Sequence, residues 1–393
     1  MPVVTKIEGR SVQGQLPPAK PAYVLRGHTA QIHSLHFFRQ NLRLLSGDAD
    51  GWVVLWNIPI KRPVAVWKPH SGTVLGLSSW GDDRVITHGM DNKLCVWQLR
   101  EADESSLSKV LPVEDAMTER KQPWLLHSLP VNALNFCTFA MCHESTIEAT
   151  RDSKVDAHVT VLIGVPGVQD GMINVSRLPS EERVATIPTP KDTNTGMLMA
   201  IGLHHSNNQG LTIVAGYESG HACVWRKNAA GMWQTMYMHK SHSQPILSLA
   251  IAPSLGFFYT SAADAIVARH TLSGDSTAPK TVQTKHAGQQ SLRVRPDEKL
   301  FATAGWDGRV RVYGAKGLHE LAVLKWHKEG CYALDLACID TPAAKNTTVE
   351  ASPDSNIQQR PPTVSQLREQ KAQKTHWLAA GSKDGKVSLW DVF

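Results

Sequence analysis

The side chains in this sequence that could perform acid–base, nucleophilic or metal-binding chemistry are its histidines, its cysteines and a recurring set of aspartates. The 393 residues include 18 His and six Cys. Zinc sites usually combine His with Cys or carboxylate ligands at short, regular spacing. Three pairs of nearby histidines lack any such companion: His204 with His205, His33 with His36, and His239 with His242. The chain also lacks the phosphate-loop, nucleophile-elbow and zinc-protease motifs. We therefore expect no catalytic site, no metal site and no cofactor, and so no enzyme.

The aspartates recur with a His, a hydroxyl residue and a Trp at similar distances. The first set is His28, Ser46, Asp50 and Trp56, and the second is His70, Thr87, Asp91 and Trp97. In both sets the hydroxyl residue lies four positions before the Asp, and the Asp lies six before the Trp. These residue types suit a buried hydrogen-bond relay, in which the His bridges the Asp and the hydroxyl, and the hydroxyl faces the indole N–H. We therefore interpret both sets as structural.

Five further units follow, and each departs from the pattern at one or more positions. In chain order they contain the turn at Asp170 and Gly171; Trp225 with Ser219 in place of the Asp; His242, Thr260 and Asp264 with His270 in place of the Trp; His286, Thr303 and Asp307 with Tyr313 in place of the Trp; and His327, Asp384 and Trp390 with Ala380 where the hydroxyl is expected. The first of these is the weakest unit, so a count of six or eight stays open beside our count of seven.

A repeat of forty-odd residues made of short strands and tight turns is typical of a β-propeller. The sequence predicts an all-β fold with seven blades, each a four-stranded antiparallel sheet. The chain stops at Phe393, directly after the third strand of the last unit. Residues 21–26 precede the first unit, and we predict that they supply the missing fourth strand and close the ring. This N-terminal pairing would also remove an exposed sheet edge.

The predicted organisation is an N-terminal extension, residues 1–20, followed by a single propeller, residues 21–393. Three insertions interrupt the period at about 100–122, 142–157 and 341–375. The last contains few aliphatic residues and is not expected to fold alone. From the order of the strands, all three insertions are predicted to lie on one face of the ring. Such a gathering often marks a binding surface; the alternative is neutral drift in solvent-exposed loops.

The opposite face is predicted to present Trp306, which immediately precedes the turn residue Asp307. The equivalent position holds Met90 in the second unit and Lys383 in the last. Because Trp is frequent at the energetic centres of protein interfaces, Trp306, Met90 and Lys383 are candidate protein-binding residues. The alternative for Trp306 is that its ring packs against a neighbouring loop. The alternating Arg309 and Arg311 are expected to face solvent.

The composition restricts the setting. The formal charge is +6, from 41 Lys and Arg against 35 Asp and Glu, without a basic cluster, so direct nucleic-acid binding is not predicted. The six cysteines show no Cys-x-x-Cys spacing, which favours a reducing compartment. The chain begins without the apolar core of a signal peptide and has no apolar stretch approaching the roughly 20 residues of a membrane span. We expect a cytosolic or nuclear protein with no membrane association.

The repeats resemble the WD-repeat superfamily over nearly the whole chain. Three stretches resemble a narrower group, the fungal ASTRA-associated protein 1 family, which is related to the G-protein β-subunit-like WD proteins. These stretches are Tyr23 to His28 running into Ile32 to Phe37; His88 to Trp97, with its Asp-x-Lys-Leu-Cys-x-Trp block; and the closing segment from Leu378 to Trp390. The abrupt end after that segment is also typical of the family.

This resemblance implies a non-enzymatic scaffold subunit of the ASTRA complex, a nuclear assembly linked to chromatin remodelling. It further implies contact with the TTT cochaperone, which stabilises phosphatidylinositol-3-kinase-like kinases. The protein is then expected to be a monomer within a hetero-complex. Its expected location is the nucleus, with the cytoplasm as an alternative or additional location. A competing hypothesis is a substrate receptor of a ubiquitin ligase, a frequent role of WD propellers. That role often uses a Trp-Asp-x-Arg sequence, which is absent after Trp56, Trp97 and Trp225.

Overall fold

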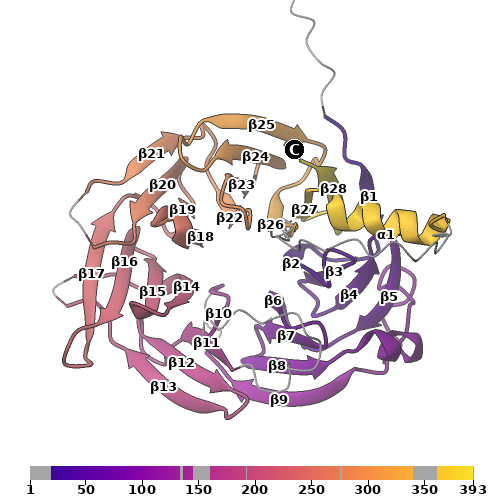
Figure 1. Cartoon of the computed structure of the whole chain (residues 1–393), viewed down its shortest axis with the longest axis horizontal. Coiled ribbons are helices and arrows are strands. Elements are labelled where there is room, and N and C mark those ends of the chain that lie inside the picture. The colour runs from indigo at the N-terminus through magenta and orange to yellow at the C-terminus, as the bar shows by residue number, and fades with distance from the viewer. Residues whose placement is uncertain are drawn as a thin grey trace, which may run out of the picture.

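The computed structural model describes residues 19–132, 136–144, 160–191, 193–274, 277–339 and 361–392. Within these residues the strands form seven antiparallel sheets of four strands each, arranged as blades around a central axis (Figure 1). The predicted all-β, seven-bladed propeller is therefore confirmed. The described part of the chain has no helix with the length and apolarity that a bilayer crossing requires.

The blades are numbered in chain order, and each runs from the inner strand to the outer strand. Blade 1 consists of β2 (Ile32–Phe38), β3 (Arg43–Asp48), β4 (Val53–Asn57) and β5 (Arg62–Trp67), and blade 2 of β6 (Val74–Trp80), β7 (Arg84–Gly89), β8 (Lys93–Gln98) and β9 (Trp124–Pro130). Blade 3 consists of β10 (Ala140–His143), β11 (Val161–Pro166), β12 (Ile173–Leu178) and β13 (Glu182–Ile187), and blade 4 of β14 (Leu198–Ser206), β15 (Gly210–Tyr217), β16 (His221–Lys227) and β17 (Trp233–Lys240). Blades 5 and 6 consist of β18 (Ile246–Ala252), β19 (Phe257–Ala262), β20 (Ile266–Thr271), β21 (Lys280–Gln283); and β22 (Gln289–Val294), β23 (Leu300–Gly305), β24 (Arg309–Gly314), β25 (Glu320–Lys325).

Blade 7 joins the two ends of the chain. Its strands are β26 (Cys331–Leu336), β27 (Trp377–Ser382), β28 (Lys386–Asp391) and, as the outer strand, β1 (Tyr23–Arg26). β1 pairs antiparallel with β28, with Tyr23 opposite Leu389 and Arg26 opposite Lys386. The predicted closure by the N-terminal strand is thus confirmed.

Tight turns at the Asp-Gly positions explain how the second and third strands of a blade connect. Gly51 has a φ of 87°, and a Cβ built on it would lie 2.0 Å from the carbonyl oxygen of His70. Only glycine adopts this left-handed conformation at no steric cost. Asn92 replaces the glycine in blade 2, with a φ of 62°. Because these turns bring the carbonyls of the next blade so close, they fix the spacing between blades as well as the hairpin.

Apolar side chains fill the spaces between neighbouring blades. A buried cluster that includes Leu25, Ile32, Leu35, Ala379 and Leu389 joins blade 7 to blade 1. Strands buried on both faces are expected to carry continuous apolar runs, and β3, β11, β23 and β27 are buried along their whole length. The core of the molecule is therefore a ring of inter-blade layers.

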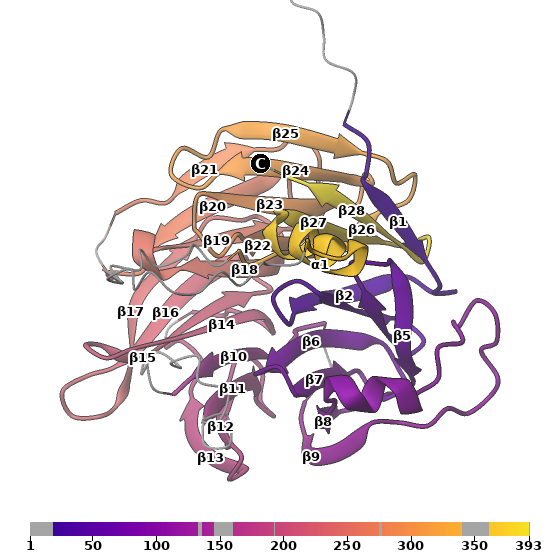
Figure 2. The same ribbon diagram turned by 45° about the vertical axis from the view of Figure 1, so that its right-hand side comes forward.

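The insertion at residues 100–122 does not stay on the predicted face, although it leaves the blade at the same side as the other two insertions. Residues 100–122 connect β8 to β9 and begin with a short 3₁₀ helix, Glu101–Ser106, beneath blade 1. The segment then follows the outer edge of β5, where Val66 donates a backbone hydrogen bond to Ser108, 2.8 Å. It reaches the opposite face, where Val113 donates to Gly27 and the Arg120 guanidinium lies 4.5 Å from the Trp52 ring (Figure 2). It acts as a strap across the edge of blade 1.

The other two insertions are described only in part. Residues 145–159 of the second lie outside the described residues, as do residues 340–360 of the third. The rest of the third contains α1 (Val364–Lys374), which begins with a capping box between Thr363 and Gln366. Ala372 of α1 is buried in the cluster between blades 7 and 1, and the Trp377 indole donates to its carbonyl, 3.0 Å. This helix is held against the ring by Ala372 and by the Trp377 indole.

Candidate protein-binding surface

The hydrogen-bond relay is complete in blade 2. His70 Nδ1 donates to Asp91, 2.9 Å, its Nε2 accepts from Thr87 Oγ1, 2.8 Å, and Trp97 Nε1 donates to the same hydroxyl, 3.0 Å. Every donor and acceptor in this hydrogen-bond relay finds one complementary partner only if the imidazole is neutral. Burial lowers the pKa of His70, which is consistent with that state. The His, Asp, Thr and Trp side chains of this relay therefore use their hydrogen-bonding groups on one another.

In blade 1 the acid of the relay is Asp48, and our assignment of Asp50 was wrong. His28 Nδ1 donates to Asp48, 2.6 Å, and Trp56 donates to Ser46, which bonds His28 Nε2. Asp48 is fully buried and also accepts the backbone N–H groups of Asp50 and Trp52. The exposed Asp50 lies two positions further along the turn. The sequence offers both acids, and only the burial of one distinguishes them.

His286 of blade 6 was also assigned wrongly. Its side chain is 42% exposed, and its Nδ1 lies 3.6 Å from Asp307. Gln289, fully buried, takes the inner position and accepts from Thr303 Oγ1 at 2.8 Å. Asp307 instead pairs with Arg311, 2.7 Å, and Arg311 is buried and does not face solvent as expected. This ion pair replaces the His–Asp hydrogen bond found in blades 1, 2 and 5.

The last blade does contain a hydroxyl, contrary to the expectation from Ala380. Ser388 lies opposite Ala380 on the neighbouring strand β28. It bonds His327 Nε2 at 2.8 Å and accepts from Trp390 Nε1 at 2.8 Å. Asp384 lies 3.6 Å from His327 Nδ1 and turns to Lys386, 3.0 Å. Blade 5 extends the relay, because His270 bonds Thr260 and also the Tyr237 hydroxyl.

The candidate binding residues occupy one repeated position. In six blades the residue before or within the turn donates its backbone N–H to the carbonyl directly preceding the inner strand. The pairs are Ala49 with Gln31, Met90 with Thr73, Glu218 with Met197, Ala263 with Pro245, Trp306 with Gly288, and Lys383 with Gly330. These residues therefore surround one opening of the ring.

Trp306 and Lys383 come together, and Met90 stands apart. Gly330 contacts the Trp306 backbone and accepts the Lys383 N–H, so blades 6 and 7 meet at this glycine. Met90 belongs to blade 2 and is separated from Lys383 by Ala49 of blade 1. Thr73 links Met90 to Ala49. Its carbonyl accepts the Met90 backbone N–H, and its hydroxyl donates to the Ala49 carbonyl, 3.3 Å.

Trp306 is both supported and accessible. Its ring lies against Gly288, where a Cβ would approach the ring carbons to 2.0 Å, and its Nε1 donates to Gln290 Oε1, 2.8 Å. The residue remains 44% exposed. Both interpretations of Trp306 thus describe part of its environment: one face of the ring packs on a loop, and the other is free to contact a partner. No sequence pattern indicated the supporting role of Gln290.

Among the described side chains, no three His, Cys, Asp or Glu residues come together as a metal site. None of the six cysteines, all of them within the described residues, forms a disulfide, and four of them are buried. The surface around Trp306 and Lys383 is a candidate contact surface built from an aromatic ring and an ammonium group.

Comparison with known proteins gives a consistent result. The family described as ASTRA-associated protein 1 matches residues 21–390. The ASTRA-associated protein 1 of Verticillium alfalfae is 46% identical, over 95% of this chain and 93% of its own. That of Aspergillus flavus is 44% identical, over 96% and 98%. That of Schizosaccharomyces pombe is 31% identical, over 95% and 99%. With a closed seven-bladed ring and this coverage, the chain belongs to the ASTRA-associated protein 1 family.

Proposed function

We propose that this protein is a non-enzymatic scaffold subunit of the ASTRA complex, acting in the nucleus and linked to chromatin remodelling. Its partners would be ASTRA subunits and the TTT cochaperone that assists the stability of phosphatidylinositol-3-kinase-like kinases. Family membership over nearly the full chain is the observation that carries this proposal. The rigid ring supports it, because a propeller offers a large preformed surface at little entropic cost of binding.

The face bearing Trp306 is the proposed contact surface. A half-exposed Trp held by a hydrogen bond and a packed ring face loses little rotational freedom on binding, and such residues dominate interface energetics. Lys383 on the adjacent blade would contribute a charge at the rim, where it affects association rate more than affinity.

The test is affinity purification of the tagged full-length chain from cells, followed by mass spectrometry. We expect ASTRA and TTT subunits to copurify, and a fluorescent fusion to concentrate in the nucleus. Recovery of cullin-ligase components in their place would identify a ubiquitin-ligase receptor and overturn the proposal.

A matched pair of variants tests the contact surface. Trp306→Ala should reduce recovery of at least one partner about tenfold or more, as expected of an interface hot spot. Trp124→Ala is the control, because Trp124 is 73% exposed but lies on the outer strand β9. Both variants should keep the thermal unfolding midpoint of the parent chain. Equal recovery with both variants would show that the Trp306 face is not the contact surface.

A further inference from the structure

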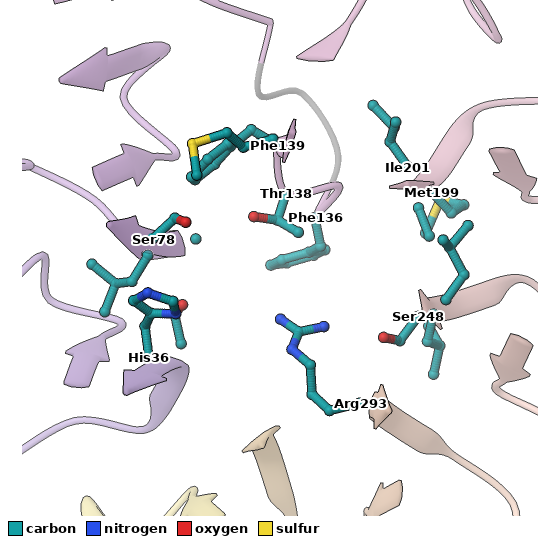
Figure 3. A pocket seen from close by; sticks show the side chains of 16 residues that line it. His36, Ser78, Phe136, Thr138, Phe139, Met199, Ile201, Ser248 and Arg293 are labelled. Carbon is teal, nitrogen blue, oxygen red and sulfur yellow. The ribbon is translucent and has the colours of Figure 1, made fainter. Parts of the chain in front are cut away.

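The centre of the ring contains a cavity of about 270 Å³, lined by residues of the inner strands and by Phe136, Thr138 and Phe139, which precede β10. Figure 3 shows the Arg293 side chain reaching from β22 into this space, toward Phe136. This site is separate from the surface around Trp306, and the inference below does not depend on the proposed function.

Polar side chains gather on one arc of the inner strands around the cavity, and His36, Ser78 and Arg293 of this arc line it. In six of the blades the pairing between the first two strands shifts register after the first residue, at Ser34, Gly76, Ala200, Ser248, Ser291 and Ala333. Two residues beyond each shift stand His36, Ser78, Gly202, Ala250, Arg293 and Asp335. Blades 6, 7, 1 and 2 are consecutive in the ring, so Arg293, Asp335, His36 and Ser78 form a continuous polar arc at one level.

Most of this arc is already satisfied by protein groups. Asp335 accepts the backbone N–H of Phe37, 2.6 Å, and His36 bonds Ser79, 3.0 Å. His36 Nδ1 lies 3.8 Å from Asp335. Burial raises the pKa of Asp335 and lowers that of His36. These two residues stabilise each other and the inner strands of blades 7 and 1.

Arg293 differs from them. Its one hydrogen bond among the described residues runs from Nη1 to the neighbouring Leu292 carbonyl, 3.2 Å. It forms no ion pair in that part of the chain, and Asp335 acts on it only through the longer-range attraction between the two charges. A guanidinium has five N–H donors and keeps its charge at all physiological pH values. Arg293 thus presents a permanent positive charge and several unused donors to an internal space.

The remainder of the lining limits what could occupy this space. Phe136, Met199, Ile201 and Leu247 supply apolar surface, and Ser248 and Thr138 supply hydroxyls. A single planar guanidinium matches the two oxygens of a carboxylate, and the charges then cancel one to one. The doubly charged phosphate group would be left with an excess of negative charge beside Asp335.

We propose that the cavity binds the carboxylate of an acidic side chain on an inserted polypeptide segment with apolar neighbours, and that Arg293 is its ion-pair partner. A small free carboxylate ion would make the same contact with the guanidinium. The apolar lining is what favours the polypeptide source, because it contacts the residues flanking the acid.

Methyl NMR of the full-length chain, labelled at Met and Ile methyl groups, can test this directly, since Met199 and Ile201 line the cavity. The probe peptide is acetyl-Leu-Glu-Phe-amide, and its control is acetyl-Leu-Gln-Phe-amide. We expect saturable shifts of both methyl signals with the Glu peptide, and at least about tenfold weaker binding of the Gln peptide, as for loss of a charge-assisted hydrogen bond.

Two further probes distinguish a carboxylate on a polypeptide from a small free anion. Sodium acetate should shift the same signals only at much higher concentration, because it lacks apolar neighbours. Acetate binding as tight as the Glu peptide would overturn the polypeptide assignment. Inorganic phosphate that binds more tightly than the Glu peptide, or a Gln peptide that binds equally, would overturn the carboxylate site.

Variants complete the test. Arg293→Met should weaken binding of the Glu peptide at least about tenfold, whereas Arg309→Met, on the outer side of the same blade, should leave it unchanged. Arg293→Lys should retain measurable binding, because it keeps the charge but loses the planar fork. Asp335→Asn should tighten binding by removing a nearby negative charge. If Arg293→Met does not fold, unchanged affinity in both of the other cavity variants would still contradict the proposal.

Discussion

At the scale of single residues, the decisive factor is whether a polar side chain is buried with a partner. Asp48 and Asp50 are two positions apart, yet only Asp48 holds the His28 imidazole and two backbone N–H groups. His88 shows the opposite case. It is fully buried, packs edge-on against Phe139, and has no hydrogen-bond partner for either ring nitrogen among the described residues. The first residue stabilises the blade, and the second makes it sensitive to acid.

The pair of aspartates provides the first prediction. Asp48→Ala should lower the free energy of unfolding by about 3 kcal/mol, because it leaves a buried imidazole and two backbone donors without an acceptor. Asp50→Ala should change it by less than about 0.5 kcal/mol, as for an exposed substitution. Urea unfolding followed by tryptophan fluorescence measures both. Equal losses in the two variants would contradict the assignment of Asp48.

The second prediction concerns pH. Burial lowers the pKa of His88 to about 3, and the nearby His70 adds to the effect. The unfolded chain, with a pKa of about 6.5, therefore takes up this proton first as the pH falls. Stability from the neutral ring is complete above pH 6.5 and declines below it, by about 2 kcal/mol at pH 5. His88→Met should remove that part of the acid sensitivity. Parallel stability profiles from pH 8 to pH 5 would disprove it.

At the scale of elements, the strap of residues 100–122 is fastened to blade 1 by a buried ion pair. Glu104 is 6% exposed and accepts from Arg43 Nε and Nη2, both at 2.9 Å, and from Arg39. This contact anchors the beginning of the strap beneath the turn between β2 and β3. The far end is held by Arg120 on the Trp52 ring. An insertion of polar composition is thus ordered by charges supplied by the blade.

The third prediction tests this anchor. Glu104→Ala should destabilise the protein by about 3–5 kcal/mol, because it leaves the buried Arg43 without its counter-charge. Glu101 also contacts Arg43 but is 75% exposed on its side chain, so Glu101→Ala should cost at most about 1 kcal/mol. Thermal and urea unfolding compare the two variants. A mild effect of Glu104→Ala would mean that the strap is held mainly by its other contacts.

At the scale of the whole molecule, ring closure joins the two ends of the chain within one blade. β1 contributes Leu25, 2% exposed, to the cluster between blades 7 and 1, and Ile32 packs against Gly381 of the last blade. A closed ring has no free inner edge at which blades could separate. The short strand β1 therefore affects the stability of segments more than 350 positions away in the sequence.

The fourth prediction follows from this closure. Leu25→Ala should lower the free energy of unfolding by about 2–5 kcal/mol, as expected for a large buried side chain cut to Ala. The neighbouring Arg26 is exposed, so Arg26→Ala should have little effect. Hydrogen exchange should show faster opening of β28 in the Leu25 variant than in the parent. Unchanged protection of β28 would show that the ring closes without the help of β1.

Local sequence patterns determined the repeat, the strands and the closure, because each depends on residue types at short, regular spacing. The period of about forty residues, the Asp-Gly turns and the missing last strand can be read from neighbours in the chain. Only the tertiary structure decided which side chains complete the relays: Asp48 and not Asp50, Gln289 and not His286, and Ser388 where no hydroxyl was expected. In the first two cases two residues of suitable chemistry compete, and burial decides between them. In the third, the pairing of β27 with β28 places Ser388 opposite Ala380. The same holds for the strap and for Arg293, whose surroundings come from blades that are distant in sequence.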